Sequence, residues 1–442
     1  MAKSKSAKKK PARPAAKKPA DLPIPSNSLH SPTITANKRH FGELQPVSDG
    51  PWTQNDSKSY FSSPYYKAEG VTAIPPLRSP NAVMNLADIV GQDEVDTISS
   101  NKKIVFHAVG DTGAMTQTSY QNDELPIAQL MGKDVGDPVL ANRAAFFFHL
   151  GDVIYEFGDD EIFYYEQFYE PYRNYNAPIF AIPGNHDGML HQANETPLQP
   201  FLNNFCAPAP VPSPDAHGLI RDTMTQPGVY FTLDAPFVSI IGLYSNILDS
   251  WPGGIISNYQ GKYAKISNVQ LDFLASELKR LSQLPPEKKG AIVIAVHHPS
   301  FGSGSKGGSP MLVADMDSIF TKTGVWPDAV LSGHAHNYQR YTRDVNGRQI
   351  PYVTAGCGGY NIKPIFPTPA NDTKSKVPAN SHALRYYAPA NGYLKISVSP
   401  QKLGIAFNST NSAFGKGADT VTVDLATHKI ISEGKGNPDG LV

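Results

Sequence analysis

Polar residues that can bind metal follow directly after five apolar segments of strand length. The five junctions are Val109 before Gly110-Asp111, Leu150 before Gly151-Asp152, Ile182 before Pro183-Gly184-Asn185-His186, Val296 before His297-His298, and Leu331 before Ser332-Gly333-His334-Ala335-His336. Ligand sites of open α/β sheets lie beyond the carboxyl ends of the strands, so we expect these side chains to converge. The glycines that precede four of these groups let the chain turn sharply and approach a cation closely.

The candidate ligands are carboxylates, an amide and imidazoles, and no cysteine is among them. Oxygen and nitrogen donors of this kind suit divalent and trivalent metals of intermediate hardness, and the lack of thiolate argues against a structural zinc site. Each motif alone has a plainer interpretation. Gly-Asp is common at strand ends, and His334-Ala335-His336 could be a surface pair. The hypothesis of one metal site therefore depends on all five motifs occurring together.

Strand-length apolar runs alternate with helical patterns from residue 104 onward. The runs are 104–109, 145–150, 179–182, 238–243, 292–296, 329–331 and 351–354, and the helical patterns are 159–169, 197–205, 267–281 and 312–321. Buried strands that alternate with covering helices predict an α/β fold. Near the end, residues 392–398, 404–408 and 419–425 alternate as antiparallel strands do.

The part before residue 104 has a different composition. Residues 1–20 contain seven Lys, one Arg and no acidic residue, which predicts a disordered basic tail. This tail is interpreted either as a solvated or targeting segment or as one that makes weak contact with polyanions. Residues 21–103 are rich in Pro and Ser, and we expect them to wrap the core as an extension. One helix is predicted there, with Ser79 as its cap and Gly91 at its end.

The composition excludes several protein classes. The chain has 442 residues, 40% of them hydrophobic, and a formal net charge of +0. No apolar run approaches the roughly 18–20 residues that span a bilayer, so no membrane span is expected. The N-terminal sequence lacks the apolar core of a secretory signal, and Cys206 and Cys357 allow one disulfide at most. These features predict a cytoplasmic protein with reduced thiols.

The five motifs resemble those of the calcineurin-like metallophosphoesterase superfamily and, within it, of the purple acid phosphatases. That family carries Gly-Asp-X-Gly, Gly-Asp-X-X-Tyr, Gly-Asn-His-Asp/Glu, Val-X-X-His and Gly-His-X-His. The corresponding residues here are 110–113, 151–155, 184–187, 294–297 (Ile for Val) and 333–336. Tyr155 is the discriminating residue, since most other members of the superfamily lack it. The resemblance covers about residues 104–400.

The resemblance implies a four-layer α/β/β/α sandwich with ligand loops at the strand ends, formed by a catalytic domain of residues 104–442. It also implies two metal ions. Asp111, Tyr155 and His336 would hold the first, commonly Fe(III); Asn185, His297 and His334 would hold the second, a divalent Fe, Zn or Mn; and Asp152 would bridge them. His186 would face the substrate phosphate and donate a proton.

The chain departs from the family in three respects. Family members are usually secreted, and the plant enzymes carry an N-terminal β-sandwich that residues 21–103 do not resemble. The loop of residues 299–310 contains Lys306 and no histidine of its own, whereas family members often place histidines there. The proton donor is therefore left open between His186 and His298.

The predicted reaction is hydrolysis of small-molecule phosphate monoesters by attack of metal-bound water or hydroxide, without a phospho-enzyme. The main alternative is a phosphodiesterase or nucleotide hydrolase, because the same metal core serves both. A non-catalytic binding protein is the third hypothesis, and the complete set of candidate ligands argues against it.

Overall fold

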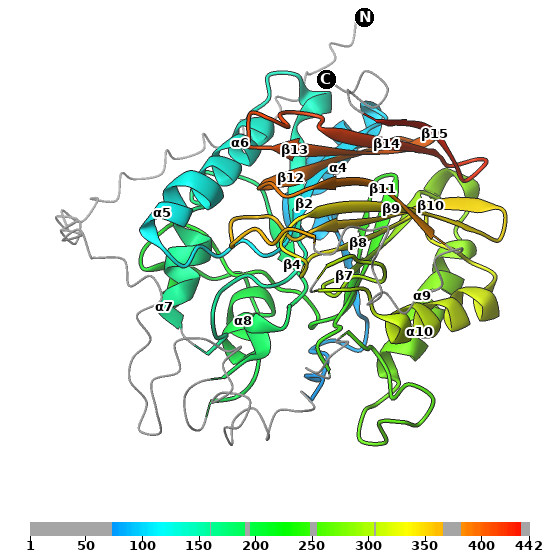
Figure 1. The fold of residues 1–442 in the computed structure, drawn as a ribbon, viewed down its shortest axis with the longest axis horizontal. Helices are drawn as coiled ribbons and strands as arrows, with labels where there is room; N and C mark the ends of the chain where they lie inside the picture. Colours follow the sequence, from blue (N-terminus) through cyan, green and yellow to red (C-terminus); the bar gives the residue numbers. More distant parts are fainter. Residues whose placement is uncertain are drawn as a thin grey trace, which may run out of the picture. The chain divides into compact units, whose positions relative to one another are not determined.

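The structure is a computed structural model that describes residues 73–159, 161–190, 195–247, 254–304, 306–365 and 382–434. Within these ranges, two β-sheets form the centre of the fold (Figure 1). One sheet has eight strands in the order β1-β5-β6-β7-β8-β10-β9-β11, and the other has seven in the order β15-β14-β13-β12-β2-β3-β4.

The seven-stranded sheet is parallel at one end and antiparallel at the other. Its strands are β2 (Ile104–Val109), β3 (Ala144–His149), β4 (Ile179–Ala181), β12 (Gly392–Val398), β13 (Lys402–Ser409), β14 (Asp419–Asp424) and β15 (Lys429–Gly434). β2, β3 and β4 are parallel neighbours, whereas β12 pairs antiparallel with β2. The carboxyl ends of the three parallel strands therefore lie at one edge.

The eight-stranded sheet contains a second parallel block. Its strands are β1 (Val83–Asn85), β5 (Phe231–Ala235), β6 (Val238–Leu243), β7 (Ala291–Val296), β8 (Ala329–Ser332), β9 (Tyr338–Val345), β10 (Arg348–Ala355) and β11 (His382–Ala388). β6, β7, β8 and β10 run parallel to their neighbours in this block. Their carboxyl ends therefore also share one edge.

Helices cover the outer faces of the two sheets. The α-helices are α3 (Ala87–Val90), α4 (Gln92–Ser100), α5 (Gln117–Ser119), α6 (Leu125–Val135), α7 (Glu161–Tyr164), α8 (Gln199–Phe205), α9 (Val269–Ser282) and α10 (Pro310–Thr323); η3 (Tyr165–Tyr169) continues α7. In Figure 1, α6 lies beside the seven-stranded sheet, while α9 and α10 lie together beside the eight-stranded sheet. α10 begins where the Ser309 side chain accepts a bond from the Leu312 amide, and it ends at Gly324.

Alternation of side chains along the strands divides the core into three layers. In β2, Phe106 and Ala108 pack between the sheets, whereas Val109 faces the helices on the outer side. In β6, Ile240 packs between the sheets and Ile241 packs against α9 and α10. Because successive residues of a strand point to opposite faces, a continuous apolar run can serve two layers at once. This arrangement confirms the expected α/β/β/α sandwich.

The helix expected from Ser79 to Gly91 is wrong in its first half. Val83–Asn85 form strand β1, which pairs parallel with β5. Within residues 79–91, α3 alone is helical, and Gly91, with a φ of 87°, ends it as expected. The apolar spacing fits a helix, but Met84 is buried in the core between the sheets, and pairing at the sheet edge overrides local propensity.

The described part of the expected extension, residues 73–103, thus contributes strand β1 to the eight-stranded sheet. The tail of residues 1–20 lies outside the described residues. Among the helices of the described ranges, none combines the length and the apolar character needed to cross a bilayer.

Candidate metal centre

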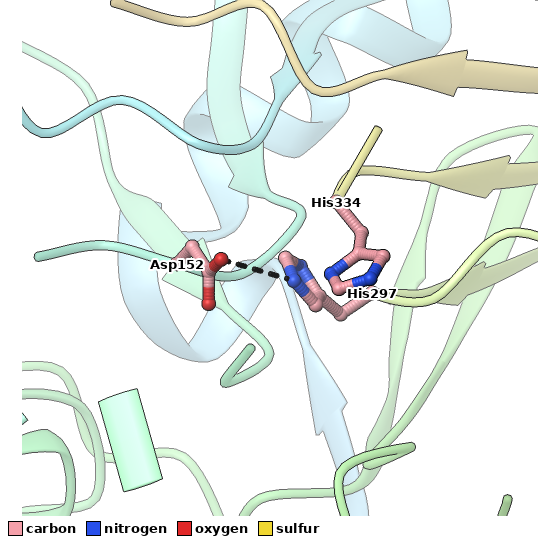
Figure 2. A group of neighbouring side chains, drawn as sticks. All are labelled: Asp152, His297 and His334. Atoms are coloured by element: carbon pink, nitrogen blue, oxygen red, sulfur yellow. Dashed lines mark ion pairs between the residues drawn. The ribbon is translucent and has the colours of Figure 1, made fainter. Parts of the chain in front are cut away.

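The predicted ligands lie in loops that leave the parallel blocks of both sheets. Asp111 follows β2, Asp152 follows β3, and Asn185 follows β4 in the seven-stranded sheet. His297 follows β7, and His334 follows β8 in the other sheet. The loops meet across the sandwich. The backbone N–H of His334 donates to Asp111 Oδ2 at 2.7 Å, and Asp152 and His297 face each other in Figure 2.

Four predicted ligands form a first group around Asp111. The Tyr155 phenol oxygen lies 2.9 Å from Asp111 Oδ1 and 3.0 Å from Asp152 Oδ2. His336 Nε2 lies 3.2 Å from Asp111 Oδ1 and 3.5 Å from the Tyr155 oxygen. All four residues are buried. Two carboxylates, a phenol and an imidazole therefore face one small volume.

A second group surrounds Asn185. Its side-chain oxygen lies 2.9 Å from His334 Nδ1 and 3.2 Å from His297 Nε2. His297 Nε2 also lies 3.2 Å from Asp152 Oδ2. Asp152 thus contacts members of both groups, which is the position that a bridging carboxylate requires.

The donor atoms fit two cations. Asp111, Asp152 and His336 offer ligand atoms within 4.8 Å of one another, and so do Asp152, His297 and His334. Ligands that bind one ion at about 2.0–2.2 Å are at most about 4.4 Å apart, so small side-chain movements suffice. Among the described residues, the buried His336 Nδ1 has no hydrogen-bond partner. This donor set of oxygens and imidazole nitrogens suits metals of intermediate hardness.

Four of the predicted ligands have left-handed backbone conformations. The φ angles are 58° at Asp111, 52° at Asp152, 68° at His334 and 50° at His336. Such conformations cost on the order of 1–3 kcal/mol each in non-glycine residues, and they cluster at functional sites. The surrounding loops hold these residues against that cost, which turns their side chains inward.

Gly184 shows how closely the loops approach. A Cβ atom at this position would lie 2.1 Å from Asp152 Oδ1, so any other residue would displace the bridging candidate. The same carboxylate oxygen accepts the backbone N–H of His186 at 2.8 Å. The loop after β4 therefore fixes the orientation of Asp152.

The charges of the side chains in this centre do not balance one another. Burial opposes ionisation of His297, but Asp152 and Asp111 outweigh it and raise the pKa of His297 to about 9. Burial, together with Asp111 and Asp152, raises the pKa of Tyr155 well above its ordinary value. The phenol therefore keeps its proton unless a cation binds beside it, because a nearby cation favours the ionised ligand.

The two candidate proton donors have different surroundings. His186 Nδ1 lies 2.8 Å from the Glu156 carbonyl oxygen; since a carbonyl only accepts, Nδ1 carries the hydrogen. His298 Nδ1 lies 2.8 Å from Ser245 Oγ. Burial and the neighbouring His297 lower the pKa of His298 well below its ordinary value. His298 is thus disfavoured as a carrier of an extra proton.

Two supporting residues show what the sequence indicates and what it does not. Asp187 accepts the backbone N–H groups of Val153 at 3.0 Å and Gly184 at 2.7 Å, so it ties the second and third motifs together. Its place in the Gly-Asn-His-Asp motif was a signal for it. Tyr360 stacks on Tyr155 with ring centroids 3.8 Å apart. Tyr360 follows β10, which ends in no ligand-type residue, so no motif pointed to it.

Comparison with known proteins identifies the family. The model of the calcineurin-like phosphoesterases matches residues 104–338, which is more than half of the chain. No curated protein sequence matches. The chain belongs to the calcineurin-like phosphoesterase family, so a phosphoric ester hydrolase that uses metal is the activity that its family implies.

Solved structures that are similar to this chain include two phosphatases and an anchor protein. A purple acid phosphatase from yellow lupin (Lupinus luteus) seeds is 16% identical with a TM-score of 0.47, over 74% of this chain and 55% of that chain. GAP50, the anchor in the inner membrane complex of Plasmodium, is 15% identical with a TM-score of 0.47, over 76% of this chain and 89% of that chain. A dimetal phosphatase from Danio rerio is 13% identical with a TM-score of 0.42, over 73% and 98%. The match spans about half the length of the lupin protein.

Proposed function

We propose that this calcineurin-like phosphoesterase hydrolyses phosphate monoesters with two metal ions. Asp111, Tyr155 and His336 would hold one ion, Asn185, His297 and His334 the other, and Asp152 would bridge them. The observation that carries the proposal is the position of Asp152, within 3.2 Å of both Tyr155 and His297. Two bound cations would clamp a phosphate, activate a water molecule and neutralise the charge of an in-line displacement.

The proposed metal at the Tyr155 position is Fe(III), with a divalent Fe, Zn or Mn at the other. The support is the phenol oxygen between two buried carboxylates, where only a strongly charged cation would remove its proton. Iron-loaded, oxidised protein should then absorb in the visible region, and Tyr155→Phe should remove this band while keeping part of the activity. A band that persists in Tyr155→Phe would show that Tyr155 is not a ligand.

The proposed proton donor is His186. Its backbone N–H contacts Asp152 and its ring packs on Tyr155 with centroids 4.2 Å apart, so the imidazole lies at the rim of the first group. His298 is the weaker candidate because burial disfavours its protonated form. In this role His186 would donate a proton to the leaving alkoxide, and the Glu156 carbonyl would hold the ring in position.

Lys306 supports a preference for monoesters over diesters. Burial and, next, the charge of Lys306 lower the pKa of His334, so the field of this ammonium group reaches the metal centre. The Lys306 side chain is only partly buried, so it can also meet a substrate. A monoester dianion would gain more from this charge than a diester monoanion, because electrostatic attraction grows with charge.

The test compares aryl phosphate monoesters and diesters on the same purified protein, with and without a chelator, alongside metal analysis. We expect two metals per chain, loss of activity on chelation, and a higher kcat/KM for the monoester. Lys306→Met should lower kcat/KM for the monoester about 10-fold. The matched control is Lys322→Met on α10, which should change neither rate.

A diester hydrolysed as fast as the monoester, with no effect of Lys306→Met on either, would favour the diesterase or nucleotide hydrolase. Absence of hydrolysis in protein with two bound metals would favour the binding protein. The cytoplasmic location, the contact of residues 1–20 with polyanions and the start of the catalytic domain at residue 104 stay predictions.

A further inference from the structure

The loop after β10 lies against the metal centre although it supplies no predicted ligand. We call residues 356–365 the β10 loop. Three backbone hydrogen bonds fix it, from Gly358 to the Gly110 carbonyl at 3.0 Å, from Tyr360 to the Asp111 carbonyl at 3.0 Å, and from Lys363 to the His336 carbonyl at 2.9 Å. The loop is therefore attached to the first and fifth motifs on either side of Tyr360.

This attachment places the Tyr360 ring flat on Tyr155. The two ring centroids are 3.8 Å apart with an interplanar angle of 12°, and the centroids of His336 and Tyr360 are 4.8 Å apart with the rings at 77°. The His186 ring also contacts Tyr155, with centroids 4.2 Å apart, and it lies 6.3 Å from the Tyr360 ring, so the three rings form a triangle. Close stacking of this kind restricts the orientation of an aromatic ring.

Tyr360 also reaches the residue that holds His186. Its phenol donates to Glu156 Oε1 at 2.7 Å, and the carbonyl oxygen of the same Glu156 lies 2.8 Å from His186 Nδ1. Glu156 is the residue directly after Tyr155 and is buried. One side chain from the β10 loop thus contacts Tyr155 directly and His186 through Glu156.

We propose that Tyr360 is a positioning residue, which orients the Tyr155 phenol by stacking and the His186 imidazole through its hydrogen bond to Glu156. This inference rests on the proposed function, because it assumes that Tyr155 binds metal and that His186 acts on the substrate. Groups that fix metal ligands and catalytic side chains typically change metal affinity or activity 10- to 100-fold when removed, so the effect should be measurable.

Two variants of Tyr360 separate the two contacts. Tyr360→Phe keeps the stacked ring and loses the bond to Glu156, whereas Tyr360→Leu loses both. For the iron-loaded protein we expect Tyr360→Phe to keep the wild-type visible band and Tyr360→Leu to shift or broaden it. With an aryl phosphate, Tyr360→Phe should lower kcat about 10-fold with little change in KM and two metals still bound.

A double-mutant cycle tests whether Tyr360 acts through Glu156. Glu156→Ala should lower kcat by about the same factor as Tyr360→Phe, and the double variant should be no slower than either single one, because residues of one network do not act additively. The matched control is Tyr393→Phe. This variant also removes a buried hydrogen bond from a tyrosine to a carboxylate, because the Tyr393 phenol donates to Asp134 at 2.9 Å. It should change neither kcat nor the visible band.

The outcomes are distinct. Wild-type kcat in Tyr360→Phe, or additive losses in the cycle, would overturn the link to His186. An unchanged band in Tyr360→Leu would overturn the stacking role and leave the proposed function intact. A colourless iron-loaded wild type would overturn both the ligand role of Tyr155 and its positioning by Tyr360. If Tyr360→Leu does not fold, Tyr360→Phe and the cycle still decide the link to His186.

Discussion

The metal centre and a second buried cluster contain the same residue types in different settings. The second, which we call the Asp134 cluster, consists of His107, Asp134, Tyr175, Tyr393 and Lys395. Asp134 contacts His107 Nε2 at 3.2 Å, the Tyr393 phenol at 2.9 Å and Lys395 Nζ at 3.0 Å. The other ring nitrogen of His107 lies 3.1 Å from the Tyr175 phenol. This network fixes α6 to β2 and β12 through regular elements.

The difference lies in charge balance and in backbone conformation. Asp134 has an ammonium group beside it, whereas the ion pairs of Asp111 and Asp152 within the described residues are with imidazoles alone. His107, Asp134, Tyr393 and Lys395 lie within strands and a helix, and Tyr175 is the one loop residue of the Asp134 cluster, whereas Asp111 and Asp152 have left-handed backbones. Buried His and Asp are therefore no sign of a metal site by themselves. A metal site is distinguished by the combination of convergent donor atoms, unbalanced charge and backbone strain.

The largest effect is expected for Asp152→Asn. The amide cannot supply negative charge to two cations, so we expect loss of bound metal and a fall in kcat of roughly a thousandfold or more. Metal analysis of the purified variant and turnover of an aryl phosphate measure both. The matched substitution in the other cluster, Asp134→Asn, should keep two metals per chain. Near-normal turnover of Asp152→Asn with two metals bound would contradict the bridging role.

A smaller loss is expected for His186→Ala, which should lower kcat about 100-fold with metal content unchanged. His186 contacts Asp152 through its backbone N–H, and this bond survives the substitution, so the bridging carboxylate should stay in place. Turnover and metal per chain are the measurements. His428→Ala, which removes an imidazole paired with Asp328 outside the metal centre, is the control. Loss of a metal ion from His186→Ala would show that His186 is a ligand.

Much of the centre could be predicted because its motifs are local. The glycine, the ligand and the preceding apolar strand are contiguous at each strand end, so the sequence of β2 and residues 110–113 already indicates one part of the site. The residue pattern predicts a helix where the short strand β1 forms, because the pairing of β1 with β5 depends on residues far along the chain. Tyr360 and the partners of Asp134 were missed for the same reason, since each contact joins distant segments.

The smallest effect on catalysis, and the clearest on stability, is expected for Asp134→Asn. Burial opposes ionisation of Asp134, but His107 and Lys395 outweigh it and lower its pKa below the ordinary value. A carboxyl whose folded-state pKa is depressed adds stability above its unfolded-state pKa of about 4, and that stability is lost as pH falls through the folded-state pKa. At pH 7 the free energy of unfolding of the variant should therefore be about 3 kcal/mol lower than that of wild type.

The difference in free energy of unfolding between wild type and Asp134→Asn should narrow below about pH 4, because there the unfolded wild type takes up a proton that the variant cannot. Burial also lowers the pKa of His107, so the neutral imidazole adds stability that both proteins lose as pH falls below its ordinary 6.5. Asp134 partly offsets this lowering of the His107 pKa, so His107 stays neutral to a lower pH in the variant, and the difference between the two proteins reports on both residues. Denaturant unfolding followed by circular dichroism from pH 3 to pH 8 measures this difference in stability.

At pH 7, the folded Asp134→Asn variant should turn over an aryl phosphate at the wild-type rate. The side chain of residue 134 belongs to a network that holds α6 and β12 to β2, and it contacts no predicted ligand. A stability difference that is constant with pH would contradict the depressed pKa of Asp134, and a variant that loses metal would mean that the two clusters are coupled.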